Sequence, residues 1–306
     1  MKGRRMAMRM KSQWIWVVRA GMLCFLVAMG VTSAIQLREK EQQRSAQSSL
    51  LPKVEAAEQE EHVLTTGTMI REFGAQDSRP MLVLSSSAAP TGKKAYLTFD
   101  DGPSLNTRRI LHILQISGIK ATFFVIGKTD PDSLALYKAI ADEGHALGNH
   151  TFSHRYNSVY ASVPAFKQDV EKLNQLLEQT AGVRPSILRF PGGSNNRMGW
   201  KSGGRHIMAK IAREMSNSGY QYFDWNVSST DAASAVQPLS DIISSVKAGS
   251  QGKQQIIVLM HDMDAKTTTV EALPEVIRYL KNQGFAFDVL TKSSFNYHFL
   301  EPEALR

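Results

Sequence analysis

From Lys93 onward, short runs rich in β-branched and aromatic residues alternate with amphipathic segments of helical periodicity. The β-rich runs cover residues 95–100, 121–126, 145–150, 187–190, 220–225, 255–260 and 285–290. Helical patterns include residues 108–115, 131–142, 165–179 and 270–282. Such alternation is typical of βα units that build a parallel sheet, and seven strands approach the eight of a (β/α) barrel. We therefore expect an α/β fold with a barrel-like parallel sheet.

Polar side chains stand at or just beyond the ends of these runs. They are Asp100, Asp101, His150, Arg189, Asp224 and His261. Active sites on folds of this kind lie at the carboxyl ends of the strands. We therefore expect these side chains to share one face of the molecule.

Two histidines four residues apart, His150 and His154, would lie on one face of a helix or tight loop. With one carboxylate they would form a site of three protein ligands. That number leaves an open position for water or substrate on a catalytic divalent metal. The nearby His145 is interpreted as a core or supporting histidine rather than a ligand.

Two turns follow the strand ends. Asp100 and Asp101 precede Gly102-Pro103, and a turn there lets both carboxylates converge on one pocket. After Arg189, the glycines at 192 and 193 allow backbone N–H groups to approach a ligand closely.

Taken together, five segments resemble a known family in order and spacing. They are Thr98-Phe99-Asp100-Asp101-Gly102-Pro103, His150-Thr151-Phe152-Ser153-His154, Arg189-Phe190-Pro191, Asp224-Trp225 and Leu259-Met260-His261. They resemble the five motifs of the polysaccharide deacetylase (NodB-homology) family, carbohydrate esterase family four, which includes bacterial peptidoglycan N-acetylglucosamine deacetylases. The resemblance covers roughly residues 93–292. It implies a distorted (β/α) barrel of seven or eight strands and a divalent metal, usually zinc, with cobalt or manganese active in some members.

The resemblance also implies a role for each motif residue. The metal ligands would be Asp101, His150 and His154. Asp100 would be the general base, oriented by Arg189, and His261 the general acid, tuned by Asp224. Substrate contacts would come from Pro191, Gly192, Trp225 and Leu259, the last two as walls of the acetyl-methyl pocket. Many members have Tyr where Gly192 stands, so the backbone donor survives here but the ring that borders the sugar does not.

The implied activity is hydrolysis of N-acetyl groups on an amino-sugar polymer. Peptidoglycan is the first expectation for the polymer, with poly-N-acetylglucosamine or chitin fragments as alternatives. An O-acetyl esterase is a second hypothesis, because the same site would cleave esters more easily than amides. A glycan-binding module without turnover is a third, disfavoured because every implied ligand and both proton-transfer residues are present.

The amino terminus predicts export. Residues 1–35 contain six of the 36 Lys and Arg residues and no acid, which leaves 30 basic against 28 acidic residues in the rest. The basic excess therefore indicates membrane topology and not a nucleic-acid partner. If Arg19 snorkels, an apolar stretch of 22 residues from Trp14 to Ile35 is long enough to cross a bilayer. A signal peptide cleaved after Ala34 is the alternative, so the catalytic domain is expected outside the cytoplasm, anchored or secreted.

The resulting domain plan has four parts. They are a basic terminus with an anchor or signal segment (1–35), a polar stalk (36–62), an amino-terminal extension (63–92) and a deacetylase domain (93–306). The single cysteine, Cys24, lies in the apolar segment, so the exported part can form no internal disulfide. We expect a monomer.

Overall fold

The computed structural model describes residues 92–300. The predicted anchor, stalk and most of the extension lie outside these residues. The strands are β1 (Lys94–Asp100), β2 (Thr122–Val125), β3 (Ala146–Asn149), β4 (Ile187–Leu188), β5 (Gln221–Tyr222), β6 (Val227–Ser228), β7 (Gln255–His261) and β8 (Ala286–Phe287). The helices are α2 (Leu105–Ser117), α3 (Pro131–Asp142), α4 (Tyr156–Val159), α5 (Val163–Ala181), α6 (Trp200–Gly203), α7 (Ile207–Asn217), α8 (Leu239–Ser250) and α9 (Thr267–Asn282), with a 3₁₀ turn, η2, at Asp231–Ala233.

All the described strands belong to one parallel sheet. Its order is β5-β4-β3-β2-β1-β7-β6, and β8 pairs with the first residues of β1. Among residues 92–300 no pairing joins β5 to β6, so the sheet is a distorted barrel open on that side. Because every strand runs the same way, the carboxyl ends share one edge, where the motif residues lie.

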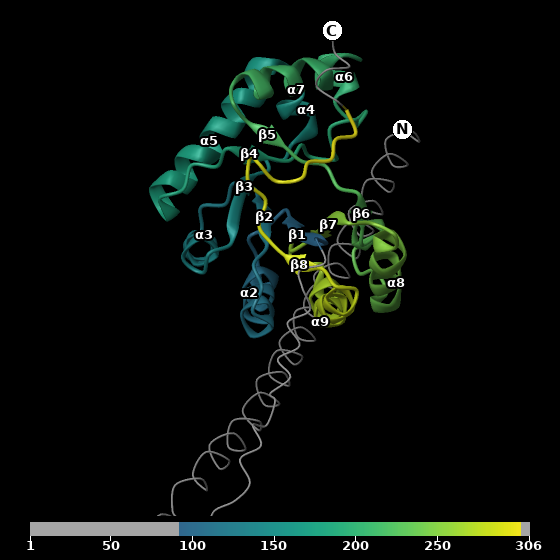
Figure 1. Cartoon of the computed structure of the whole chain (residues 1–306). Coiled ribbons are helices and arrows are strands. Elements are labelled where there is room, and N and C mark those ends of the chain that lie inside the picture. Colours follow the sequence, from purple (N-terminus) through teal and green to yellow (C-terminus); the bar gives the residue numbers. More distant parts are fainter. Residues whose placement is uncertain (1–91, 301–306) are drawn as a thin grey trace, which may run out of the picture. The chain divides into compact units, whose positions relative to one another are not determined.

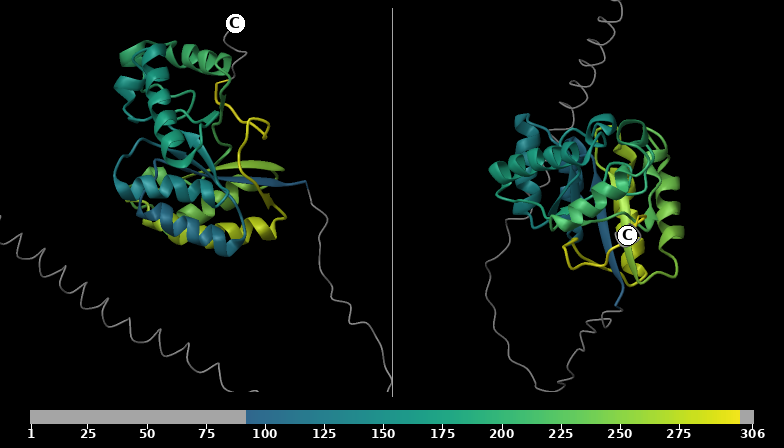
Figure 2. Two further views of the ribbon diagram at one scale, coloured as in Figure 1. Left: turned by 90° about the vertical axis from the view of Figure 1, so that its left-hand side faces the viewer. Right: turned by 90° about the horizontal axis from the view of Figure 1, so that it is seen from above.

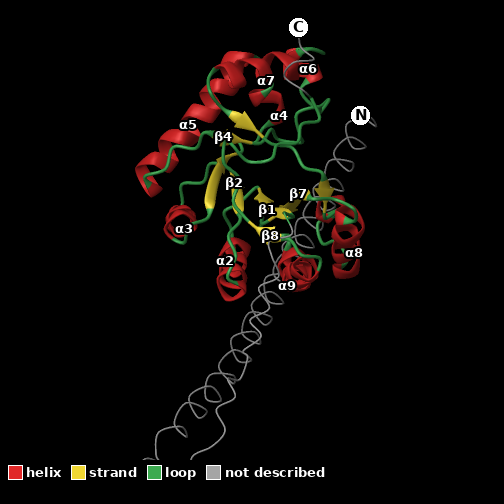
Figure 3. Cartoon of the chain, viewed as in Figure 1, coloured by secondary structure: helices red, strands yellow, loops and turns green. Residues whose placement is uncertain are grey.

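Helices cover the outside of the curved sheet, as Figures 1 and 3 show. Neighbouring helices contact one another in the order α8, α9, α2, α3, α5 and α7. Figure 2 shows this layer from two further sides. No helix between residues 92 and 300 combines the length and apolar character needed to cross a bilayer.

Alternation along β1 separates the core from the site. Ala95, Leu97 and Phe99 pack in the large apolar cluster beneath the outer helices. The intervening Tyr96 belongs to a smaller cluster with residues of β2, β4 and β7 on the other face of the sheet. Successive side chains of a strand point to opposite faces, so Thr98 and Asp100 share the face of Tyr96. The last residue of β1 therefore presents a carboxylate inside the barrel.

Capping residues fix where the main helices begin. Ser104 starts α2 in a capping box with Thr107, and Asp130 starts α3 by accepting from the N–H of Ser133, with Pro131 in the first turn. Ser162 caps α5 in the same way. The short loops before α2 and α3 keep these two helices close to the strand ends that precede them.

All seven predicted strands are present, and the predicted helical segments lie within α2, α3, α5 and α9. The sequence patterns missed β6, which has only two residues, and the helices α4, α6, α7 and α8. β6 contains a single apolar residue, Val227, between polar neighbours, whereas the equally short β4, β5 and β8 lie within longer runs rich in apolar or aromatic residues.

Candidate active site

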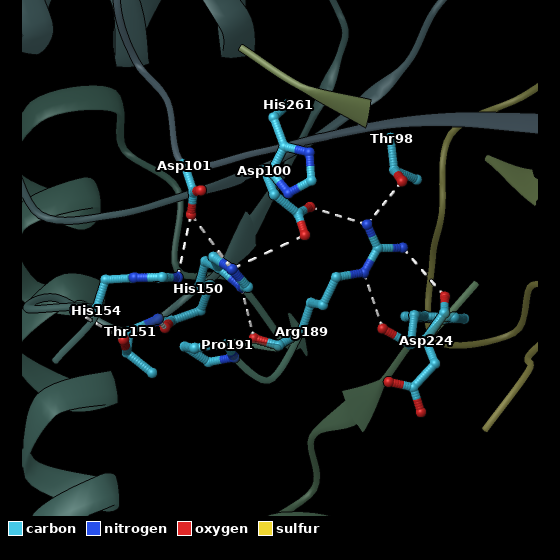
Figure 4. A network of polar contacts seen from close by, with 12 residues as sticks. Thr98, Asp100, Asp101, His150, Thr151, His154, Arg189, Pro191, Asp224 and His261 are labelled. Carbon is cyan, nitrogen blue, oxygen red and sulfur yellow. Dashed lines mark hydrogen bonds and ion pairs between the residues drawn. The ribbon is translucent and has the colours of Figure 1, made fainter. Parts of the chain in front are cut away.

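Three of the predicted side chains converge at the carboxyl edge of the sheet. Asp101, His150 and His154, hereafter the ligand cluster, each offer a ligand atom, and these atoms lie within 4.8 Å of one another. Asp101 Oδ1 lies 3.5 Å from His150 Nε2 and 3.2 Å from His154 Nε2 (Figure 4). One carboxylate and two imidazoles at this spacing can hold a divalent cation.

The chemistry of the ligand cluster fits a cation. Asp101 Oδ1 is buried and has no hydrogen-bond partner within residues 92–300. His150 Nδ1 lies 2.8 Å from the carbonyl oxygen of Arg189, so this nitrogen donates and Nε2 keeps its lone pair toward Asp101. Burial lowers the pKa of His150 to about 3, which keeps the ring neutral, as metal ligation requires.

Left-handed backbone conformations orient two of the predicted ligands, Asp101 and His154. Asp101, Thr151 and His154 have φ values of 73°, 66° and 50°, in the left-handed region that non-glycine residues rarely adopt. The hydroxyl of Thr151 accepts from the N–H of His154 at 3.2 Å, which fixes this loop. Such strain is concentrated at functional sites and depends on the surrounding structure for its maintenance.

Gly102 is required by a close approach behind the ligand cluster. A Cβ atom there would lie 2.2 Å from Oδ2 of the buried Asp262. That carboxylate accepts from Thr107 Oγ1 at 2.5 Å, and burial raises the pKa of Asp262 to about 7. Only glycine lets the Asp100–Asp101 turn pack against this group.

Asp100, the predicted general base, is held by the fully buried Arg189. Arg189 Nη1 donates to Asp100 Oδ1 at 2.8 Å and to Thr98 Oγ1 at 2.7 Å. Its Nε and Nη2 donate to the carbonyl oxygens of Phe223 and Asp224. Burial raises the pKa of Asp100, and the charge of Arg189 opposes this shift. The geometry thus brings together the predicted base and the residue expected to orient it.

His261 lies beside Asp100, because the two residues are direct partners in the pairing of β1 with β7. Since β7 and β3 lie on opposite sides of β1, Asp100 stands between His261 and the histidines of the ligand cluster. We call Asp100 and His261, the predicted general base and general acid, the proton-transfer pair. Figure 4 shows both beside Arg189.

The partner of His261 is Asp231 and not the expected Asp224. Asp231 Oδ1 lies 2.8 Å from His261 Nδ1, and Asp231 Oδ2 accepts from the backbone N–H of His261 at 2.7 Å and from Thr269 Oγ1 at 2.9 Å. Burial alone would lower the pKa of His261. The hydrogen bond and charge of Asp231, with the charges of Asp100 and Asp101, outweigh burial and raise the pKa to about 9.

The carboxylate of Asp224 is occupied elsewhere. It accepts from the N–H and the hydroxyl of Ser194 at 2.8 and 2.5 Å, and from the N–H of Phe299 at 2.7 Å. Asp224 therefore ties the turn after Arg189 to the carboxyl-terminal segment, and only its carbonyl oxygen contacts Arg189. The prediction that Asp224 tunes His261 is wrong in its geometry.

The predicted substrate contacts border the same region. Gly192, with φ 76°, is exposed, and its N–H donates to no other residue between 92 and 300. The carbonyl oxygen of the preceding Pro191 accepts from Tyr160 Oη at 2.8 Å. The Trp225 ring lies 5.7 Å from the guanidinium carbon of Arg189, and Leu259 pairs with Thr98 in the sheet. Trp225 therefore lies beside Arg189 and Leu259 beside Thr98, the residue to which Arg189 donates.

Sequence comparison relates this chain to known proteins. A family model described as polysaccharide deacetylase matches residues 87–208. YheN of Bacillus subtilis, named as a polysaccharide deacetylase, is 30% identical over 210 residues, which are 67% of this chain and 70% of that protein. The chain belongs to the polysaccharide deacetylase family.

Two further relatives of this chain carry more specific names. A peptidoglycan-N-acetylglucosamine deacetylase of Bacillus cereus is 29% identical over 210 residues, 66% of this chain and 71% of that protein. The crystal structure of the catalytic domain of a peptidoglycan N-acetylglucosamine deacetylase from Eubacterium rectale superposes with a TM-score of 0.63 at 36% identity. It covers 68% of this chain and 93% of that domain. The described part of this chain therefore shares the fold of that catalytic domain.

Asp231, the partner of His261, is the residue of the candidate site that the sequence patterns missed. It lies three residues beyond β6, a strand whose single apolar residue gave no strand signal. The available signal was an acid shortly after Val227-Ser228, ahead of the next helix, in a stretch of small polar residues.

Proposed function

We propose that this deacetylase hydrolyses the N-acetyl groups of N-acetylglucosamine units in peptidoglycan, with a divalent metal bound by Asp101, His150 and His154. One observation carries the proposal. The ligand cluster lies against Asp100, and Asp100 in turn lies beside His261 across the β1–β7 pairing. A metal site, a base and an acid are the three parts that amide hydrolysis needs.

The donor set favours zinc, with cobalt or manganese as alternatives. Two imidazole nitrogens and one carboxylate oxygen suit a borderline cation and leave a coordination position open. When bound, the cation would lower the pKa of a water molecule and polarise the acetamide carbonyl group.

Asp100 is the group placed to take a proton from the attacking water. Arg189 holds one carboxylate oxygen, and the other, Oδ2, lies 3.8 Å from His150 Nε2, on the side of the ligand cluster. The exposed N–H of Gly192 is available to donate to the oxygen that becomes negative in the transition state.

His261 is the group placed to protonate the leaving amine, which cannot depart as an anion. A pKa of about 9 keeps the ring protonated at neutral pH. Its hydrogen bond from Nδ1 to Asp231 leaves Nε2 to carry the transferred proton. Proton removal and proton delivery therefore come from neighbouring strands.

The names of the relatives support peptidoglycan as the polymer. The test incubates the full-length chain, purified in detergent with zinc, with peptidoglycan, chitooligosaccharides and acetylated xylan, and measures free amine and acetate separately. We expect amine and acetate in equal amounts from the first substrate. Acetate from xylan without amine from any amino-sugar substrate would favour the O-acetyl esterase, and binding without either product would favour the glycan-binding module.

We further propose that the catalytic domain is displayed outside the cytoplasm on a membrane anchor. The support is the sequence of residues 1–35, in which six cations and no acid accompany an apolar segment. Protease added outside intact cells should cleave between Gln36 and His62. Protection of this stretch until the membrane is opened would contradict the proposal and the cell-wall substrate with it.

A further inference from the structure

Tyr156 is an aromatic residue of the site that the proposed mechanism does not use. It begins α4, two residues after His154. The two rings meet edge to face, with centroids 5.5 Å apart and an interplanar angle of 80°. Tyr156 is partly exposed, so its ring lies at the rim of the ligand cluster.

The tip of the Tyr156 ring occupies the space beside Gly192. A Cβ atom at Gly192 would lie 3.0 Å from Tyr156 Oη and 3.2 Å from Cε1. Gly192 carries the unpaired N–H described above and has no side chain to border the substrate. The phenol of Tyr156 therefore supplies the wall that residue 192 cannot.

Neighbouring contacts hold this arrangement in place. The Tyr156 ring lies 6.0 Å from that of the fully buried Tyr160. The hydroxyl of Tyr160 and the amide nitrogen of Asn196 both donate to the carbonyl oxygen of Pro191, at 2.8 and 3.1 Å. The helix that carries Tyr156 and the turn that carries Gly192 are thus fastened to each other.

The hydroxyl of Tyr156 is left with an unused donor. It makes no hydrogen bond to any residue between 92 and 300. A phenol has an ordinary pKa of about 10, so this hydroxyl is protonated and able to donate at neutral pH.

We propose that Tyr156 is a specificity-determining residue, whose ring forms a wall of the sugar subsite and whose hydroxyl donates a hydrogen bond to a hydroxyl of the bound N-acetylglucosamine unit. The proposal rests on the proposed function for its substrate class. An aromatic face suits the C–H surface of a sugar ring, and the free donor fixes its orientation.

Two substitutions separate the wall from the hydrogen bond. The full-length chain with zinc is assayed on tetra-N-acetylchitotetraose and on 4-nitrophenyl acetate, which has no sugar. For Tyr156→Phe we expect KM for the oligomer to rise about 5–10-fold, the equivalent of one hydrogen bond, with kcat nearly constant. For Tyr156→Ala we expect a larger rise in KM, because the wall is lost as well. In both variants kcat/KM for the aryl acetate should change by less than about twofold, since this substrate has no sugar for the hydroxyl or the ring of Tyr156 to contact.

A matched control is Tyr279→Phe, on α9, whose hydroxyl contacts the carbonyl oxygen of Lys247 at 3.3 Å. It should leave both KM values unchanged. An unchanged oligomer KM in Tyr156→Phe would overturn the proposal. So would an equal defect on the aryl acetate or a loss of bound zinc, because Tyr156 would then act only by supporting His154.

Calorimetric binding of the same oligomer distinguishes this proposal from the proposed function. Suppose that the wild-type chain binds the oligomer without releasing amine, and that Tyr156→Phe binds it more weakly. This result would contradict the deacetylase activity but support the role of Tyr156 in binding. Equal affinity of the two proteins, or no binding by either, would contradict the role of Tyr156.

Discussion

The ligand cluster and the proton-transfer pair are built in different ways, although both lie at the same edge of the sheet. The ligands Asp101 and His154 stand on loops with left-handed backbone. Asp100 and His261 end paired strands, and their register fixes them side by side. The ligand cluster leaves a buried carboxylate oxygen without a partner, whereas Asp100 and His261 each have one, in Arg189 and Asp231.

In the proposed mechanism this difference corresponds to two tasks, metal binding and proton transfer. Partnerless ligand atoms on strained loops gain their missing interactions when a cation binds, so the cluster should depend on metal for its order. The proton-transfer pair is preorganised by hydrogen bonds and strand pairing, and should keep its geometry with or without metal. A substitution in either the ligand cluster or the proton-transfer pair therefore tests whether the other group keeps its own property.

The largest effect is expected from breaking the ligand cluster. His150→Ala and His154→Asn should lose bound metal and at least about 10³-fold in activity, because two protein ligands cannot complete the site. Asparagine tolerates the left-handed φ of residue 154, so a loss of metal in His154→Asn would not be caused by backbone strain. Metal content by mass spectrometry and kcat/KM are the measurements. The exposed His112 on α2 is the control, since His112→Ala should change neither. Full metal occupancy in both variants would exclude these residues as ligands.

Removal of the predicted general base should lower the reaction rate without loss of the metal. Asp100→Asn should keep stoichiometric metal, since all three members of the ligand cluster remain, while kcat falls about 10²–10⁴-fold. Some stability should also be lost, because the buried Arg189 then faces a neutral group. Equilibrium dialysis with zinc and steady-state rates test both statements. Loss of metal in this variant would show that Asp100 belongs to the cluster.

A smaller effect is expected from Asp231→Asn, which removes the charge that holds His261. The rate should fall about 10-fold to 10²-fold, less than complete loss of an acid. His261 has a pKa above its ordinary value of 6.5, so activity should fall as pH rises through its pKa, and this limb should move to lower pH in the variant. The His261–Asp231 pair should add stability below about pH 6.5 that is lost as pH rises through about 9. Rate and melting profiles against pH, compared between the two proteins, measure both effects.

The smallest catalytic effect is expected from Asp224→Asn. Its carboxylate joins Ser194 to Phe299, so the variant should be destabilised by about 1–3 kcal/mol while the pH profile stays in place. Denaturant unfolding and the pH–rate profile distinguish this variant from Asp231→Asn. A shifted profile in Asp224→Asn with none in Asp231→Asn would restore the assignment predicted from the sequence.

The same contrast explains what the sequence could predict. Periodicity located every strand of more than two residues, and the spacing of His150 and His154 indicated a metal site, because both signals are local. The partner of His261 depends instead on where a loop after the two-residue β6 lies in space. The contact of Tyr156 with Gly192, 36 residues later in the chain, likewise could not be predicted from the sequence. Contacts between distant segments leave no periodic signal.

A substitution of His261 is the most direct test of whether metal binding and proton transfer are carried out by different residues. In His261→Ala, the loss of kcat/KM on an N-acetylglucosamine oligomer is compared with the loss on an aryl acetate, at full metal occupancy. An amine must be protonated as it leaves, whereas an activated phenolate need not be. We therefore predict a loss of about 10²-fold or more on the oligomer and a much smaller loss on the ester. Equal losses on the two substrates would contradict the general-acid role and the separation of metal binding from proton transfer.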